Sequence, residues 1–412
     1  MPDFSGLNIK NQFITVLKEN GITEPTPVQL QAIPVLLAGR DVSVQAQTGT
    51  GKTLAFILPL LQQLDIKKTY VQGLIITPTR ELALQITLEA KKLAAAAELN
   101  VLAVYGGQDV EQQMKKLTGS IHLIIGTPGR LLDHMRRRTV TLSGITRLVL
   151  DEADQMLHMG FLNDVEELII HTSAKRQTML FSATMPPQVK ALAKRFMNSP
   201  VHIHVASERV TLDEIKQTVI RTTEQEKVDK LCGLLDKYRP YLAIVFCHTK
   251  QRAIELGETL TVRGYKADEL HGDLSQAKRE QVLKRFREAK LQILVATDIA
   301  ARGLDIEGVT HIFNYDIPHD VASYIHRIGR TGRAGETGEA ITFVTPEERE
   351  YLRLIERGTG QSFGNPAGGK NTQPRREKKN TGVPFWGKQK QQNEKRTHSG
   401  TNLRSRRKKT TV

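Results

Sequence analysis

Short runs of apolar and β-branched residues alternate with helix-like stretches along most of this 412-residue chain. Some runs, such as residues 148–150 and 293–295, are apolar at every position, which is typical of strands buried on both faces of a parallel sheet. Alternation of strands with helices indicates βαβ units. The strands expected in a first series are residues 41–45, 73–77, 101–105, 122–125, 147–150, 177–181 and 201–205, and those in a second series are 217–222, 242–247, 267–270, 292–296, 311–314 and 340–344.

The two series predict two tandem α/β domains. We expect the first domain at residues 1–205, a polar linker at 206–216 and the second domain at 217–360. Residues 361–412 are rich in Gly, Asn, Gln, Lys and Arg and poor in apolar residues, so they cannot bury enough surface to fold alone. This segment is therefore expected to be a disordered tail.

The positive charge of the chain is concentrated in this tail. The net charge is +15, and residues 361–412 hold 14 Lys or Arg against two acids, which leaves the rest of the chain nearly neutral. A concentrated basic segment favours a polyanionic partner, most often nucleic acid. A solubilising tail or a contact with a membrane surface would give the same charge pattern.

Cysteine use and hydropathy indicate a cytoplasmic protein. Cys232 and Cys247 lie among apolar residues, as expected for reduced core thiols rather than a disulfide or a metal site. The first ten residues lack the basic-then-apolar pattern of a signal peptide. No apolar run approaches the ~18 residues that a membrane span needs, so no membrane partner is expected.

A glycine-rich loop follows the first expected strand and precedes a helix expected at residues 54–64. It consists of Ala46, Gln47, Thr48, Gly49, Thr50, Gly51, Lys52 and Thr53. In this context it is a P-loop, with Ala46 where the general pattern has glycine. Backbone N–H groups and the helix N-terminus would hold phosphate, Lys52 would reach the β- and γ-phosphates, and Thr53 would ligate Mg²⁺. The alternative is a chance glycine-rich turn.

Four residues, Asp151-Glu152-Ala153-Asp154, follow the strand expected at residues 147–150. Hard cations prefer oxygen ligands, so Asp151 is a candidate partner for Mg²⁺. Glu152 could orient or deprotonate an attacking water. Alone, such a group more often caps a helix N-terminus; its position after a P-loop in the same domain favours the catalytic interpretation.

Together these residues resemble the DEAD-box family of RNA helicases, and the likeness covers roughly residues 4–344. It implies two RecA-like domains that bind ATP and Mg²⁺. Gly21–Gln29 is similar to the segment that reads adenine in this family, with Gln29 bonding the base edge. Phe4 matches the aromatic residue that stacks on the base, and Ile22 replaces a frequent Phe.

The resemblance also assigns roles to loops that follow other strands. It implies that Ser182, Thr184, Asp154 and His326 couple the nucleotide state to RNA. It implies that RNA sugar and phosphate groups, which carry no base sequence, are contacted from both domains. The residues for this role are Arg80, Gly106, Gly107, Thr127, Arg130, Thr249, Arg279 and Thr297.

In the second domain, Asp305 would contact the ribose of ATP. Arg330 and Arg333 resemble the arginine fingers, whose guanidinium groups bind phosphate oxygens in a fork. With Lys52, Asp151 and Glu152 they would form a catalytic set divided between two domains that close on ATP and RNA.

The function implied is an ATP-dependent RNA helicase that grips the RNA backbone without reading sequence. The basic tail would add RNA affinity, and ribonucleoprotein or ribosome-assembly partners are compatible with the family. Two alternatives stay open: a DNA translocase of the same superfamily, and an RNA-binding clamp whose hydrolysis only times release.

Overall fold

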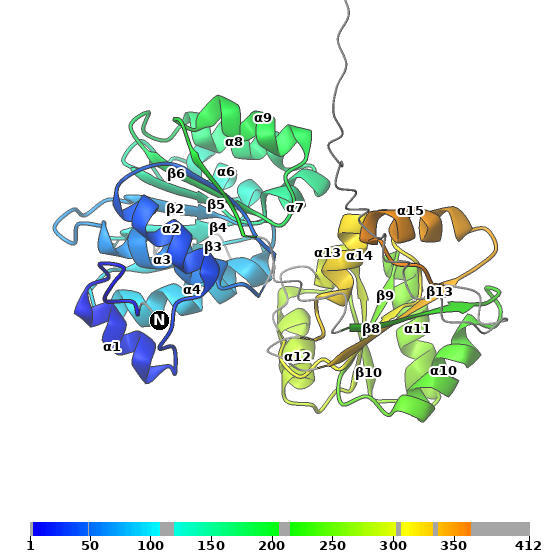
Figure 1. Cartoon of the computed structure of the whole chain (residues 1–412). Helices are drawn as coiled ribbons and strands as arrows, with labels where there is room; N and C mark the ends of the chain where they lie inside the picture. Colours follow the sequence, from blue (N-terminus) through cyan, green and yellow to red (C-terminus); the bar gives the residue numbers. More distant parts are fainter. Residues whose placement is uncertain are drawn as a thin grey trace, which may run out of the picture. The chain divides into compact units, whose positions relative to one another are not determined.

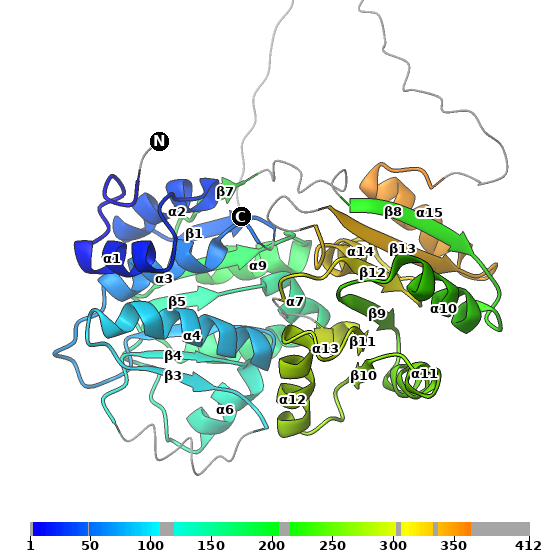
Figure 2. The same cartoon turned by 90° about the horizontal axis from the view of Figure 1, so that it is seen from below.

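The computed structural model describes residues 3–47, 49–107, 119–205, 215–301, 306–332 and 337–363. Residues up to Phe363 form one compact unit. Within this unit two parallel sheets are each built from a separate stretch of sequence (Figures 1 and 2). The expected tandem α/β architecture with parallel sheets is therefore confirmed.

The first sheet has seven strands in the order β3-β4-β2-β5-β6-β1-β7, and every pair is parallel. Its strands are β1 (Val42–Gln45), β2 (Gly73–Ile76), β3 (Val101–Val104), β4 (Leu123–Gly126), β5 (Arg147–Leu150), β6 (Gln177–Ser182) and β7 (Val201–His204). Because all strands run the same way, the loops after them leave from one edge of the sheet, where α/β proteins bind ligands.

Helices cover both faces of this sheet (Figure 1). One core joins the sheet to α1 (Asn11–Glu19), α2 (Pro27–Leu37), α3 (Lys52–Gln62) and α4 (Arg80–Ala95). The other joins it to α6 (Pro128–Arg136), α7 (Ala153–His158), α8 (Leu162–Ile170) and α9 (Pro187–Phe196). Two-sided burial explains why Leu148, Val149 and Leu150 are all apolar.

The second sheet has six parallel strands in the order β10-β11-β9-β12-β13-β8. They are β8 (Ile215–Arg221), β9 (Ala243–Cys247), β10 (Ala267–Leu270), β11 (Ile293–Thr297), β12 (His311–Asn314) and β13 (Gly338–Val344). One core contains α10 (Lys227–Tyr238) and α11 (Lys250–Val262). The other contains α12 (Gln276–Arg287), α13 (Asp298–Ala301), α14 (Val321–Ile328) and α15 (Arg349–Thr359).

Two expected boundaries need correction. Strand β8 begins at Ile215, inside the segment expected to be linker, because Ile215 and Lys216 pair with Gly338 and Glu339 of β13. Residues 361–363 belong to the folded unit rather than to the expected tail, because the N–H of Phe363 donates to Glu356 Oε1 at 2.9 Å and its ring lies edge-on to Tyr324. Residues 364–412 lie outside the described residues.

Helix α3 begins at Lys52, two residues before the expected start. Gly51 caps the helix with φ of 85°, a left-handed conformation that glycine adopts without steric cost. Both cysteines are buried and unpaired, as expected. Across the described residues, no helix has the length and apolar character to cross a membrane.

Candidate nucleotide and RNA site

The P-loop connects the end of β1 to the start of α3. Gly49 and Gly51 both have positive φ, 82° and 85°, which turns the loop sharply before the helix. The ammonium group of Lys52 is buried and donates to Ala46 O at 2.9 Å, across the mouth of the loop. Thr50 Oγ1 donates to Gln47 O at 2.8 Å. Thr48, also expected in this loop, lies outside the described residues.

Gln29 lies against the P-loop but does not face open space. Its Nε2 donates to Gly51 O at 3.0 Å, and its Oε1 accepts from Thr26 N at 2.9 Å as part of a capping box at the start of α2. Both ends of the amide expected to read adenine are therefore engaged within the protein. A Cβ on Gly51 would lie 2.6 Å from Gln29 Nε2, so the contact requires glycine.

Phe4, expected to stack on the base, lies in a core of the first domain. Its side chain is 2% exposed and packs in the core that joins α1–α4 to the first sheet. As it stands in the structure, the ring presents little surface on which adenine could stack.

The acidic group at the end of β5 lies beside Lys52. Burial raises the pKa of Asp151 to about 7, although the charge of Lys52 opposes the shift. Glu152 adopts a left-handed conformation with φ of 53°, uncommon for a residue with a side chain. Its buried Oε2 has no hydrogen-bond partner. Two desolvated carboxyl groups at the end of a buried strand are costly unless a ligand compensates them.

Asp154 is bonded directly to the loop after β6. Its Oδ2 accepts from the N–H and the hydroxyl of Thr184 at 2.9 and 2.8 Å, and its N–H donates to Ser182 Oγ at 3.1 Å. Burial alone would raise the pKa of Asp154, but the charge of His326 and the hydrogen bonds from Thr184 and Ser182 hold it below its ordinary value. The structure thus brings together the four residues expected to couple nucleotide state to RNA.

Gln155, which the sequence analysis did not select, lies next to this group. Its Nε2 lies 2.5 Å from His326 Nδ1. The sequence carried a weak signal, since Gln155 directly follows the acidic group, but a single Gln in a helix has no recognisable role by itself.

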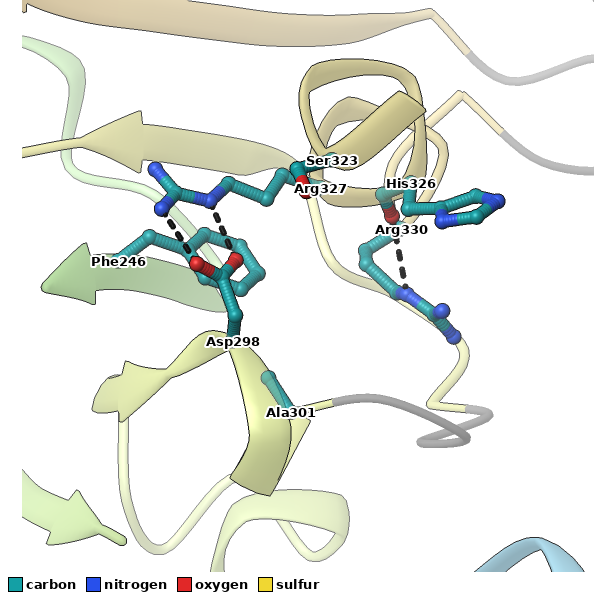
Figure 3. A pocket seen from close by; sticks show the side chains of 7 residues that line it. All are labelled: Phe246, Asp298, Ala301, Ser323, His326, Arg327 and Arg330. Carbon is teal, nitrogen blue, oxygen red and sulfur yellow. Dashed lines mark hydrogen bonds and ion pairs between the residues drawn. The ribbon is translucent and has the colours of Figure 1, made fainter. Parts of the chain in front are cut away.

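A small pocket in the second domain holds Arg330 (Figure 3). Beside it, Arg327 donates to both carboxylate oxygens of Asp298 at 2.6 and 2.7 Å, and its guanidinium carbon lies 5.0 Å from the centre of the Phe246 ring. Arg327 also donates to Asn314 Oδ1 and Asp316 O.

Arg327 therefore links α14 to strand β9 and to the chain at the ends of β11 and β12. Arg330 Nε donates to His326 O at 3.2 Å. No role was expected for Arg327 or Asp298, although they directly follow His326 and Thr297 in the sequence. Arg333 and Asp305 lie outside the described residues.

Three loops in the segments expected to contact RNA place a threonine directly before a helix. Thr79, Thr127 and Thr249 are the residues before α4, α6 and α11, with Thr79 and Thr249 accepting backbone N–H groups as helix caps. Gly106 and Gly107 pack so closely on the Arg80 guanidinium that a Cβ would crowd it. Arg130 lies in the first turn of α6, and Thr297 ends β11.

Arg279 is the exception. Its guanidinium is buried and donates to Glu81 Oε1 at 2.6 and 2.9 Å, to His271 O at 3.1 Å and to Ala300 O at 3.3 Å. Charge-assisted bonds between a guanidinium and a carboxylate are strong. In the structure, Arg279 therefore joins Glu81, His271 and Ala300 and does not present its charge to an RNA phosphate.

A P-loop at the end of a parallel strand, with buried carboxyl groups beside it, defines a nucleoside triphosphatase of the RecA-like class. Residues 26–192 match the model of the DEAD/DEAH box helicase family, and residues 226–335 match the helicase conserved C-terminal domain. The chain is 50% identical over 359 residues to the DEAD-box ATP-dependent RNA helicase CshA of Geobacillus kaustophilus, covering 87% of this chain and 77% of that protein. It is 51% identical to the CshA of Listeria monocytogenes, covering 87% and 69%. The chain belongs to the family of DEAD-box ATP-dependent RNA helicases.

Solved structures agree with this assignment. The S. cerevisiae Dbp5 bound to RNA and ADP BeF3 matches with a TM-score of 0.81 and 31% identity, covering 88% of this chain and 94% of that one. Mss116p bound to ssRNA and AMP-PNP matches with a TM-score of 0.78 and 30% identity, covering 87% and 77%. The two-domain RecA-like fold is thus that of helicases solved with RNA and a nucleotide analogue.

Proposed function

We propose that this chain hydrolyses ATP when RNA is bound and uses the cycle to separate short RNA duplexes locally. The observation that carries the proposal is the direct bonding of Asp154 to Ser182 and Thr184, which links the acidic group beside the P-loop to the loop after β6. Such a link lets a change at the γ-phosphate alter the arrangement of a second loop.

The residues around the P-loop fit a Mg²⁺ ion. Thr53 and Asp151 offer the oxygen ligands that a hard cation prefers, and a cation would compensate the buried carboxyl groups of Asp151 and Glu152. When bound, the ion would neutralise charge on the phosphates.

Hydrolysis would depend on groups from both domains. Lys52, released from Ala46 O, would bind the β- and γ-phosphates, with Gly49, Thr50 and Gly51 supplying backbone N–H donors. Glu152, whose Oε2 is unpaired, would accept a hydrogen bond from the attacking water and orient it. Arg330, with Arg333, would stabilise negative charge on the transferring group, and Asp305 would bind the ribose.

RNA would be held by its backbone and not by its bases. The helix-capping threonines and the Arg80–Gly106–Gly107 contact suit sugar and phosphate oxygens, which are the same in every sequence. The basic segment at residues 364–412 would strengthen this binding electrostatically.

Buried reduced cysteines are consistent with a protein of the cytoplasm. Ribonucleoprotein particles are partners compatible with the tail.

The deciding experiment measures ATP hydrolysis by the whole chain alone, with single-stranded RNA and with single-stranded DNA. We expect strong stimulation by RNA only, followed by unwinding of short RNA duplexes. Equal stimulation by DNA would contradict the RNA preference. Stimulation without strand separation would make the chain an RNA clamp whose hydrolysis times release.

The tail is tested separately by removing residues 364–412. The truncated protein should need more RNA for half-maximal ATPase activity, and its RNA affinity should depend less steeply on salt. An unchanged salt dependence would assign the tail to another partner.

A further inference from the structure

The first domain contains a cavity that is lined neither by the residues proposed to bind ATP nor by the loops proposed to bind RNA. Its volume is about 650 Å³, within the ~300–1,000 Å³ typical of small-molecule sites. Its walls are β1, β7 and α9, together with residues on either side of α9. The RNA loops follow β2, β3 and β4, which lie in the other half of the seven-stranded order.

Strand alternation explains why this cavity exists. Val42 and Val44 of β1 and Ile203 of β7 are buried in the core that contains α2, on one face of the sheet. Side chains on neighbouring positions point to the opposite face. There Ser43 pairs in register with His202, and Gln45 with His204, and these four polar residues line the cavity.

Helix α9 only partly covers that face. Val189 and Leu192 pack into the core beside β5 and β6, whereas Lys190 and Lys194, one turn apart, are exposed along the cavity. Across the described part of the chain, no carboxylate forms an ion pair with either lysine. Like charges four positions apart on a helix repel each other, and an anion bound between them would offset that repulsion.

The remaining wall is apolar and adaptable. Met185 and Met197 lie at the two ends of α9, and Ala193 lies between them. Methionine side chains are flexible and polarisable, and they pack well on flat rings. The cavity therefore combines cationic groups with an apolar surface, which suits neither a metal cation nor a neutral hydrocarbon.

From this arrangement we propose that the cavity is a binding site for a small organic anion with a flat apolar body, separate from the ATP and RNA sites. The anionic group lies between Lys190 and Lys194, near His202. The body lies against Met185 and Met197, and Gln45 offers a hydrogen bond. The occupant would touch the chain at Gln45, directly before the P-loop, and at Met185, directly after Thr184.

The test uses 8-anilinonaphthalene-1-sulfonate, an anionic aromatic fluorophore, titrated into the whole chain. We expect saturable binding with a dissociation constant at or below about 1 mM. The double variant Lys190→Glu/Lys194→Glu should weaken binding about tenfold, which corresponds to ~1.4 kcal/mol. Lys190→Arg/Lys194→Arg should retain it, because the charges remain.

Lys91→Glu/Lys237→Glu is the matched control, since it makes the same change in net charge at exposed lysines that do not line the cavity. N-phenyl-1-naphthylamine, which has the same rings but no sulfonate, should bind more weakly and respond equally little to all variants. Thermal unfolding of each variant checks that the fold is intact.

Three results would overturn the proposal: equal loss of binding in the control variant, displacement of the fluorophore by ATP or by single-stranded RNA, or no saturable binding. Competition by uridine monophosphate or by an aromatic carboxylate then distinguishes a phosphate-bearing occupant from a carboxylate-bearing one.

Discussion

Thr184 binds the same carboxylate oxygen of Asp154 twice, through its backbone N–H at 2.9 Å and through its hydroxyl at 2.8 Å. The backbone bond follows from the position of the loop, but the hydroxyl bond depends on the side chain. The two can therefore be separated by mutation, because valine has nearly the shape of threonine and no hydroxyl.

We expect Thr184→Val to uncouple hydrolysis from unwinding. A hydrogen bond to a charged group contributes about 1.5–3 kcal/mol, so its loss should loosen the loop after β6 without removing any group proposed to bind ATP. RNA-stimulated hydrolysis should fall modestly and duplex unwinding should fall much further. The measurement is the ratio of the two rates, with Thr172→Val, which removes a buried hydroxyl bonded to Ile169 O, as the control. Equal reduction of both rates would rule out a coupling role.

Glu152→Gln should slow hydrolysis by on the order of 10²–10⁴ while leaving binding intact, because an amide cannot accept a proton from water. The variant should hold ATP and RNA together, since the step that releases them is blocked. Single-turnover hydrolysis and RNA retention with ATP measure this. Asp164→Asn on α8 changes the charge equally away from the site and should behave as wild type. Normal turnover by Glu152→Gln would exclude the proposed role.

Gly51→Ala should weaken ATP binding by more than the backbone strain of the substitution alone would cause. The substitution forces a side chain into left-handed backbone, at about 1–2 kcal/mol, and brings Cβ within 2.6 Å of Gln29 Nε2. Gly160→Ala is the matched control, because Gly160 has φ of 77° and nothing within 4 Å of the added Cβ. Both variants should lose similar stability in urea, but only Gly51→Ala should lose ATP affinity. Equal ATP affinity in the two would show that the Gly51–Gln29 contact is unimportant.

Arg327→Met should destabilise the second domain. Removing one partner of a buried ion pair typically costs 3–5 kcal/mol, and about 3 kcal/mol is expected here because Asp298 is one-quarter exposed. Adding Asp298→Asn should restore part of the stability, since it removes the uncompensated charge. Urea unfolding of single and double variants measures this. No recovery in the double variant would mean that Arg327 acts mainly through Asn314, Asp316 and Phe246.

Among the described residues, the sequence predicted each strand and the positions of most loops, because these follow from local pattern. The order of the strands did not follow from it, since β1 pairs with two strands that come last in the first series. Gln155 and Glu81 were missed for a related reason. Their partners, His326 and Arg279, are distant in sequence, and a polar residue shows no sign of a distant partner until the chain is folded.

Phe4 and Gln29 show a second limit. Both match residues that bind adenine in the family. Phe4 is buried in the core, and both ends of the Gln29 amide are bonded within the protein. Sequence likeness identifies which residue type a position needs, but not whether the side chain is available before the ligand arrives. Availability depends on the competition between the ligand and the contacts of the folded protein.

Strand β1, which carries the P-loop, pairs only with β6 and β7 among the described strands. Its first partner begins at Gln177, whereas β1 ends at Gln45. At a synthesis rate of about 5–20 residues per second, roughly 7–26 s pass after β1 is made before synthesis of a partner strand begins. During synthesis the P-loop is therefore made early, but the sheet that positions it forms late. A nascent first domain that ends before β6 would contain the P-loop sequence without a formed nucleotide site.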